Sequence, residues 1–255
     1  MKIYLSLIKK EFMESIRTKK LPIILVLFLL IGLIGPLTAK LAPLIFEIIL
    51  PEGFSLKIPE PVEIDSWIQF FKNINQVGMI GMVLLFSTNI VNEFQKGTLI
   101  NLLSKGLPRY YIILSKVSFN IFVWMISYTL CFFVSWIYTG YFFGNSYPIY
   151  RILQSVSFPF IFGLFLISIE VLGSIITENV VGTLIFVVLS VVIQFMFSIK
   201  AEMMKYFPIY LINRPVNIIN GISINDYLLS MLITFIIIII AVLSSIFIMN
   251  KKQIS

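Results

Sequence analysis

Residues 93–116 read EFQKGTLINLLSKGLPRYYIILSK, a polar interruption between two apolar runs that keeps a helical pattern. Three leucines recur at helical spacing and give the segment one apolar side: Leu99, Leu102 and Leu103. Three basic residues stand at its edges: Lys96, Lys105 and Arg109. Gly106-Leu107-Pro108 then breaks the pattern. The segment therefore predicts a short helix on the membrane surface, between two membrane spans.

The composition supports a membrane environment for the apolar runs on both sides. The chain of 255 residues is 59% hydrophobic and 12% charged, whereas a soluble domain carries about 25% charged residues. A chain of this length cannot hide so much apolar surface from water. Several apolar runs reach the roughly 20 residues that a helix needs to cross about 30 Å of hydrocarbon. The sequence predicts an all-α membrane protein.

Several classes of site are disfavoured by the residues that the chain lacks. It has no histidine and one cysteine, Cys131, which lies in an apolar run. Histidine-based acid–base catalysis and the common metal sites are therefore not expected. No GxxxxGK[ST] motif or paired nucleophile and base is present. We expect no catalytic residue, no bound metal or cofactor on this chain, and hence no enzyme.

The first 20 residues predict an amphipathic helix separate from the spans. Its apolar stripe steps by three or four positions: Leu5, Ile8, Phe12 and Ile16. Basic residues, including Arg17, occupy its other faces and its end. Such a helix lies in the membrane interface and contacts lipid. The alternative is a positively charged anchor without a helix.

Residues 21–255 predict one domain of six spans. Their expected bounds are about 21–40, 74–92, 115–140, 152–176, 180–199 and 227–249. Before the second span, Trp67, Phe70 and Phe71 suggest an aromatic belt at the membrane interface. The first turns of the 110–143 run are expected to return from the interface. Residues 200–226 fit either short helices that dip into the outer leaflet or an ordinary loop.

The distribution of basic residues predicts the orientation. The net charge is +7, and most of the charges flank apolar runs, which indicates topological anchoring and not nucleic-acid binding. The segments expected inside carry Lys and Arg at higher density than those expected outside. We expect a multi-pass protein of the cell membrane with both termini in the cytoplasm, which requires an even number of spans.

Two polar residues stand inside the predicted spans, Glu170 in the fourth and Gln194 in the fifth. A charge at the bilayer centre costs roughly 2.5–3.5 kcal/mol on insertion scales, so such residues usually face protein or water. For Glu170 we weigh a role in helix packing or conformational coupling against a proton relay. A relay would need a chain of partners, and the spans supply no histidine and no second acid.

With this segment and this pattern of spans, the chain resembles the permease subunits of type-2 ABC exporters. The similarity covers nearly the whole length: an amphipathic basic N-terminus, six spans, the long loop after the second span and short helices before the last. The most specific positions are Glu93 with Gly97-Thr98-Leu99, then Leu102-Leu103, then Pro108-Arg109 and Leu114-Ser115-Lys116.

The resemblance implies that the segment is a cytoplasmic coupling helix, which contacts a separate ATPase subunit that binds ATP and Mg²⁺. It also implies that two permease copies, identical or paralogous, form the cargo path. The coupling residues would be Glu93, Lys96, Gly97, Thr98, Leu99, Leu102, Leu103, Pro108 and Arg109. The apolar and aromatic spans suggest amphipathic peptides or lipophilic drugs as cargo.

Two other functions fit the same residues. A membrane scaffold or immunity factor that transports nothing could use the segment to recruit a cytosolic protein. An ion-coupled carrier is the third hypothesis, and the low number of charges within the spans disfavours it.

Overall fold

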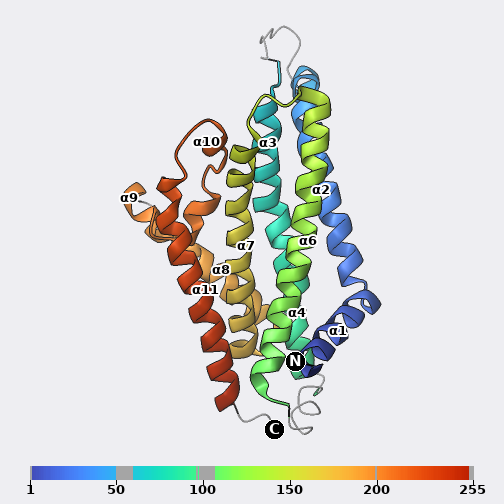
Figure 1. Ribbon diagram of the computed structural model, residues 1–255, viewed down its shortest axis with the longest axis vertical. Helices are drawn as coiled ribbons and strands as arrows, with labels where there is room; N and C mark the ends of the chain where they lie inside the picture. Colours follow the sequence, from blue (N-terminus) through green and yellow to red (C-terminus); the bar gives the residue numbers. More distant parts are fainter. Residues whose placement is uncertain (1, 50–59, 96, 98–106, 199, 253–255) are drawn as a thin grey trace.

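The computed structural model describes residues 2–49, 60–95, 97, 107–198 and 200–252, and these are helical without any strand. Within these ranges, six helices are long and apolar enough to cross a membrane. Figure 1 shows the long helices running roughly alongside one another in one elongated bundle. The prediction of an all-α membrane protein with six transmembrane helices is confirmed.

The described helices follow in chain order. They are α1 (Lys2–Arg17), α2 (Lys20–Ile49), α3 (Glu63–Asn73), the π-helix η1 (Ile74–Gly78), α4 (Met79–Gln95), α6 (Arg109–Phe143), α7 (Ile149–Thr177), α8 (Val180–Phe197), α9 (Ala201–Met204), the 3₁₀ helix η2 (Pro208–Ile212), α10 (Val216–Ile219) and α11 (Asn225–Lys251).

One end of the bundle collects a large share of the basic residues. α1, the C-terminal end of α4, the start of α6 and the C-terminal end of α11 all lie at the lower end in Figure 1. We call this the basal end. The chain turns from α1 into α2 at Thr18-Lys19, where Lys19 has a φ of 59°. α1 and the C-terminal end of α11 therefore lie at the same end of the bundle.

The second span begins earlier than the sequence predicts. The helix is continuous from Glu63 through the π turn to Gln95. The acidic residues at its start stabilise the first turn of the helix. The Asp65 carboxylate accepts a hydrogen bond from the amide of Val62, the residue before α3, at 2.9 Å. Trp67 and Phe70 are fully buried in the core and Phe71 is almost fully buried. The expectation of an interfacial aromatic belt at these residues is therefore wrong.

The third span also differs from its prediction. α6 is a single helix of 35 residues, so its first turns do not form a separate return from the interface. At 1.5 Å per residue it is about 52 Å long, which exceeds the roughly 30 Å of a hydrocarbon core. Part of α6 must therefore extend beyond the apolar layer.

Residues 200–226 form short helices, and not the ordinary loop that was the alternative expectation. η2 and α10 pack against α7, and η2 also packs against α11. Ile209, Leu211 and Ile219 are buried there. Gln194 joins α8 to this region, because its Oε1 accepts a hydrogen bond from the Ile209 amide at 3.0 Å. Gln194 thus satisfies a buried backbone group.

α7 is the most buried span, and close contact with α6 depends on a glycine. Trp124 is fully buried, and its indole N–H donates to the Phe160 carbonyl at 3.1 Å. The indole ring covers Gly163 so closely that a Cβ at that position would overlap with it. The absence of a side chain at Gly163 therefore allows Trp124 to pack between α6 and α7.

We expect Gly163→Ala to destabilise the fold by about 1–3 kcal/mol, because the added methyl group overpacks the Trp124 site. Gly35→Ala is the matched control, since its Cβ would lie 3.4 Å from the Phe70 nitrogen, at an ordinary contact distance. Thermal unfolding in detergent measures both variants. Equal melting temperatures for the two would contradict the packing argument.

Candidate functional site

Helix α1 packs on the bundle with a face other than its apolar stripe. Leu7, Glu11 and Ser15 are buried, although two of them are polar. The stripe faces outward: Leu5 is 57% exposed, Phe12 39% and Ile16 48%, while Ile8 is half-buried and Arg17 is exposed. The apolar stripe is thus free to contact lipid, and a charged side chain enters the bundle in its place.

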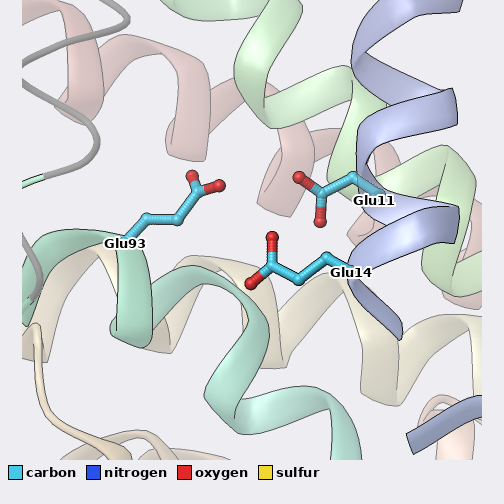
Figure 2. Close-up of side chains that lie close together, drawn as sticks. All are labelled: Glu11, Glu14 and Glu93. Atoms are coloured by element: carbon cyan, nitrogen blue, oxygen red, sulfur yellow. The ribbon is translucent and has the colours of Figure 1, made fainter. Parts of the chain in front are cut away.

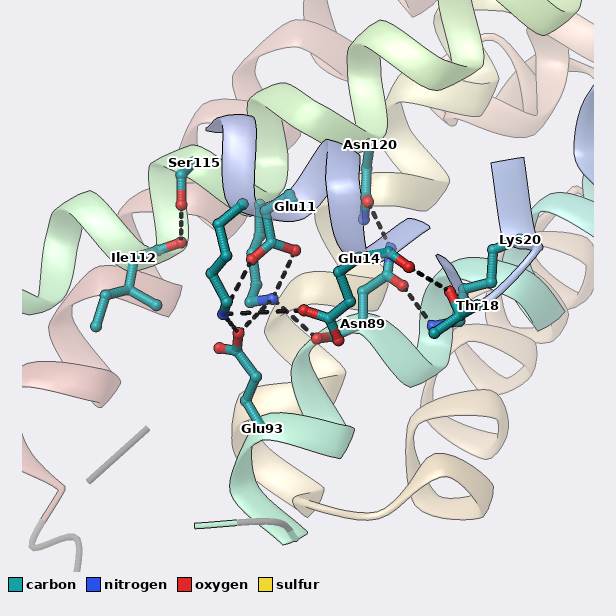
Figure 3. Close-up of polar contacts among 11 residues, drawn as sticks. Glu11, Glu14, Thr18, Lys20, Asn89, Glu93, Ile112, Ser115 and Asn120 are labelled. Atoms are coloured by element: carbon teal, nitrogen blue, oxygen red, sulfur yellow. Dashed lines mark hydrogen bonds and ion pairs between the residues drawn. The ribbon is translucent and has the colours of Figure 1, made fainter. Parts of the chain in front are cut away.

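Ion pairs join α1, α4 and α6 at the basal end. Lys116 of α6 is 2% exposed, and its Nζ lies 2.9 Å from Glu11 Oε2 and 3.2 Å from Glu93 Oε1. Lys10 also pairs with Glu93. Figure 3 shows these contacts converging between the three helices. We call Lys10, Glu11, Glu93 and Lys116 the basal junction.

Polar residues deeper in the bundle extend the basal junction. Lys116 Nζ also donates to the Asn89 carbonyl at 2.9 Å. The Asn89 side-chain amide donates to Asn120 Oδ1 at 2.9 Å, and Asn89 Oδ1 accepts from Lys20 Nζ at 2.7 Å (Figure 3). These contacts bring α2 into the same network, so four helices are linked through α4.

The acidic residues of this region raise the possibility of a metal site. Carboxylate oxygens of Glu11, Glu14 and Glu93 lie within 4.8 Å of one another, and Figure 2 shows the three side chains together. However, the ammonium groups of Lys10 and Lys116 bind these same carboxylates. Two cations already neutralise most of the negative charge, so the set suits ion pairing better than a divalent ion.

The charge of Lys10 is maintained by its partners. Burial lowers the pKa of Lys10, but the attraction of Glu93 and of the neighbouring acids outweighs it, so the pKa is raised above 10.5. A raised pKa means that this contribution to stability is present below about pH 10.5 and is lost as the pH rises further. The Lys10 ammonium therefore stays charged throughout the physiological range.

A second group of contacts closes the basal end around Arg109, the first residue of α6. Its Nη1 donates to the carbonyl oxygens of Met249 at 2.6 Å, Asn250 at 3.1 Å and Lys252 at 2.6 Å. The last carbonyl groups of a helix have no partners within the helix and carry partial negative charge. Arg109 thus caps α11 from the start of α6.

Lys252, the residue after α11, makes a further contact with α7. Its Nζ donates to the Ile175 carbonyl at 2.5 Å and pairs with Glu178 in the α7–α8 turn. It also lies 5.3 Å from the centre of the Phe94 ring, near the end of α4. The end of α11 is therefore tied to α4, α6 and α7.

The structure places only part of the predicted coupling segment. Glu93 is 3% exposed within the basal junction, and Arg109 contacts α11. Gly97 follows α4 with a φ of 64°, and Pro108 directly precedes α6. The remaining predicted positions, including the expected coupling helix, lie outside the described residues: Lys96, Thr98, Leu99, Leu102 and Leu103.

An open apolar groove lies farther along the bundle, between η1–α4, α7 and α8. Its volume is about 590 Å³. Aliphatic and aromatic side chains form its walls, and its polar lining residues are Asn75 and Gln76 on the π-helix. Glu170 is 1% exposed, and neither carboxylate oxygen has a hydrogen-bond partner among the described residues.

Sequence reasoning did not find the pairing of Glu11 with Lys116. One signal was present, because Glu11 lies between Leu7 and Ser15 on a helix face distinct from the apolar stripe. On α6, Lys116 and Asn120 are four residues apart and thus share a face. These spacings mark polar faces, but they do not identify the partners.

Comparison with known proteins supports the membrane assignment at a coarse level. No family model matches the chain, and no solved structure matches it. A protein described as the uncharacterized transmembrane protein YxlG of Bacillus subtilis is 22% identical over 185 residues, which cover 71% of this chain and 70% of that protein. Together with six apolar helices, this similarity supports a multi-pass membrane protein.

We expect Lys116→Met to destabilise the protein by about 3–5 kcal/mol, because removing one member of a buried ion pair leaves the other uncompensated. Lys9→Met is the control, since Lys9 is exposed on α1. Thermal unfolding in detergent compares the two. If Lys116→Met melted like Lys9→Met, the basal junction would not be a structural requirement.

Proposed function

We propose that this chain is the permease subunit of an ATP-driven exporter and is coupled to a separate ATP-binding-cassette subunit. The observation that carries the proposal is that both flanks of residues 96–106 are anchored. Glu93 on one side binds Lys10 and Lys116, and Arg109 on the other side caps α11. A force applied to the intervening segment would reach four helices at once: α1, α4, α6 and α11.

The charge distribution supports a cytoplasmic position for the basal end. This end carries a dense group of basic residues: Lys9, Lys10, Arg17, Lys19, Lys20, Arg109, Lys116, Lys251 and Lys252. Lys and Arg near the ends of spans favour the cytoplasmic side. In this proposal both termini are cytoplasmic, the protein lies in the cell membrane, and the ATPase approaches the basal end.

The apolar groove supports a route for lipophilic or amphipathic cargo. It is open to one side along α4 and α8, where Ile80 and Val188 are exposed. A second permease copy, identical or paralogous, would cover that side and complete the path. ATP and Mg²⁺ would bind to the partner subunit, so this chain would move cargo without catalysing a reaction.

The first test is purification of the tagged chain from its native membrane, followed by identification and ATPase assay of the proteins that accompany it. We expect a stoichiometric ATPase, which is lost in Leu102→Asp because a charge replaces an apolar contact. Leu102→Met is the control and should keep the partner. A chain that purifies alone, or with a protein that hydrolyses no ATP, would instead favour the scaffold function.

A second variant separates partner binding from transmission. Arg109→Gln removes the cap on α11 but leaves the leucines of the segment intact. We expect this variant to keep the ATPase partner and to lose most of the cargo-stimulated ATPase activity in liposomes. Full stimulation would show that the contact between α6 and α11 has no part in coupling.

A further inference from the structure

An open cavity of about 480 Å³ lies against α1. Among the described residues, its lining comes from one face of this helix, which we call the basic face: Ser6, Lys9, Lys10, Met13, Glu14 and Arg17. Three of these side chains are basic and one is acidic, so positive charge is in excess there. The basic face is distinct from the face of α1 that packs on the bundle.

Lys9 and Arg17 are the available charges of the basic face. Both are exposed, and neither forms an ion pair within the described part of the chain. Lys10, by contrast, lies 3.9 Å from a carboxylate oxygen of Glu14 and also pairs with Glu93 in the basal junction. A negatively charged ligand at the basic face would therefore meet Lys9 and Arg17 as unpaired cations.

The basic face borders the apolar stripe of α1. Lys9 lies four residues after Leu5 and three before Phe12, and residues at these spacings are neighbours on a helix surface. Met13, which is 45% exposed, lies four residues from both Lys9 and Arg17 and connects them. α1 thus presents exposed apolar side chains beside cations, which is typical of a helix that lies in the interface of an anionic membrane.

The packing of α1 fixes its position relative to the spans. Glu11 is 6% exposed, and its ion pair with Lys116 holds another side of α1 against the bundle. The turn at Thr18-Lys19 leads directly into α2, the first span, and Figure 1 shows α1 running obliquely to it. α1 is therefore held close to the end of the first span, the level at which lipid headgroups lie.

We propose that the basic face of α1 binds the phosphate groups of anionic lipids through Lys9 and Arg17, with the acyl chains against the apolar stripe. The guanidinium group of Arg can donate two hydrogen bonds to a phosphate, and Lys supplies a compact charge. An acidic protein surface would meet the same cations, but the exposed apolar stripe beside them favours lipid. This site lies outside the proposed exporter function, and lipid binding requires no ATPase.

The test titrates the full chain, purified in an uncharged detergent, with phosphatidylglycerol and with phosphatidylcholine of the same acyl chains. Native mass spectrometry measures the bound lipid. Both lipids carry a phosphate, but phosphatidylcholine also carries a positive charge, so the difference in affinity reports the net negative charge. We expect phosphatidylglycerol to bind more tightly. Inorganic phosphate at the same concentration should not displace it, because inorganic phosphate has no acyl chains.

Variants of exposed and half-buried residues locate the site on α1. Lys9→Gln with Arg17→Gln should weaken phosphatidylglycerol binding about tenfold, as expected for the loss of two exposed ion pairs. Lys205→Gln with Lys251→Gln removes the same charge from exposed lysines elsewhere and is the matched control. Glu14→Gln removes the acidic residue that lines the cavity, and it should tighten binding about threefold.

Three results would overturn the lipid site: equal affinity for the two lipids, displacement of phosphatidylglycerol by inorganic phosphate, or a Lys9–Arg17 double variant that binds as tightly as its control. A double variant that keeps the lipid but loses a copurifying ATPase would assign the basic face to a protein partner and would overturn it as well. The Leu102→Asp purification tests the exporter function separately, so either proposal can fail alone.

Discussion

A buried ammonium group held between carboxylates from two other helices is the interaction on which the basal end of the bundle depends. Lys116 enters from α6, Glu11 from α1 and Glu93 from α4, and each is almost fully shielded from solvent. None of these charges is tolerable there alone, because desolvation of an unpaired ion costs several kcal/mol. The three helices must therefore come together as a set, and the position of α1 under the bundle follows.

The six spans could be predicted because crossing a membrane imposes a minimum length of apolar helix. The extension of the second span could not. Glu63 and Asp65 indicate a polar loop by composition, yet the carboxylate of Asp65 caps a helix and that of Glu63 is buried beside the Trp67 indole. An aromatic residue at a span end also suits either the interface or the core, and only packing distinguishes the two.

Local sequence identified important positions in the site without their partners. Glu93 and Arg109 belong to a recognisable pattern, but Glu93 pairs with a lysine 83 residues earlier and Arg109 with carbonyl groups about 140 residues later. Glu170 is noticeable as a lone acid in a span. Its complete burial depends on the packing of α7 against the neighbouring helices, which no single segment encodes.

The contact between Arg109 and the end of α11 has a consequence for biosynthesis. Arg109 opens the third span, but its acceptors Met249, Asn250 and Lys252 belong to the last turn of the sixth span and the residues that follow. A nascent chain that has inserted five spans therefore still has an incomplete basal end. Closure has to wait for translation of the final helix, so the basal end can assemble only after the sixth span has been made.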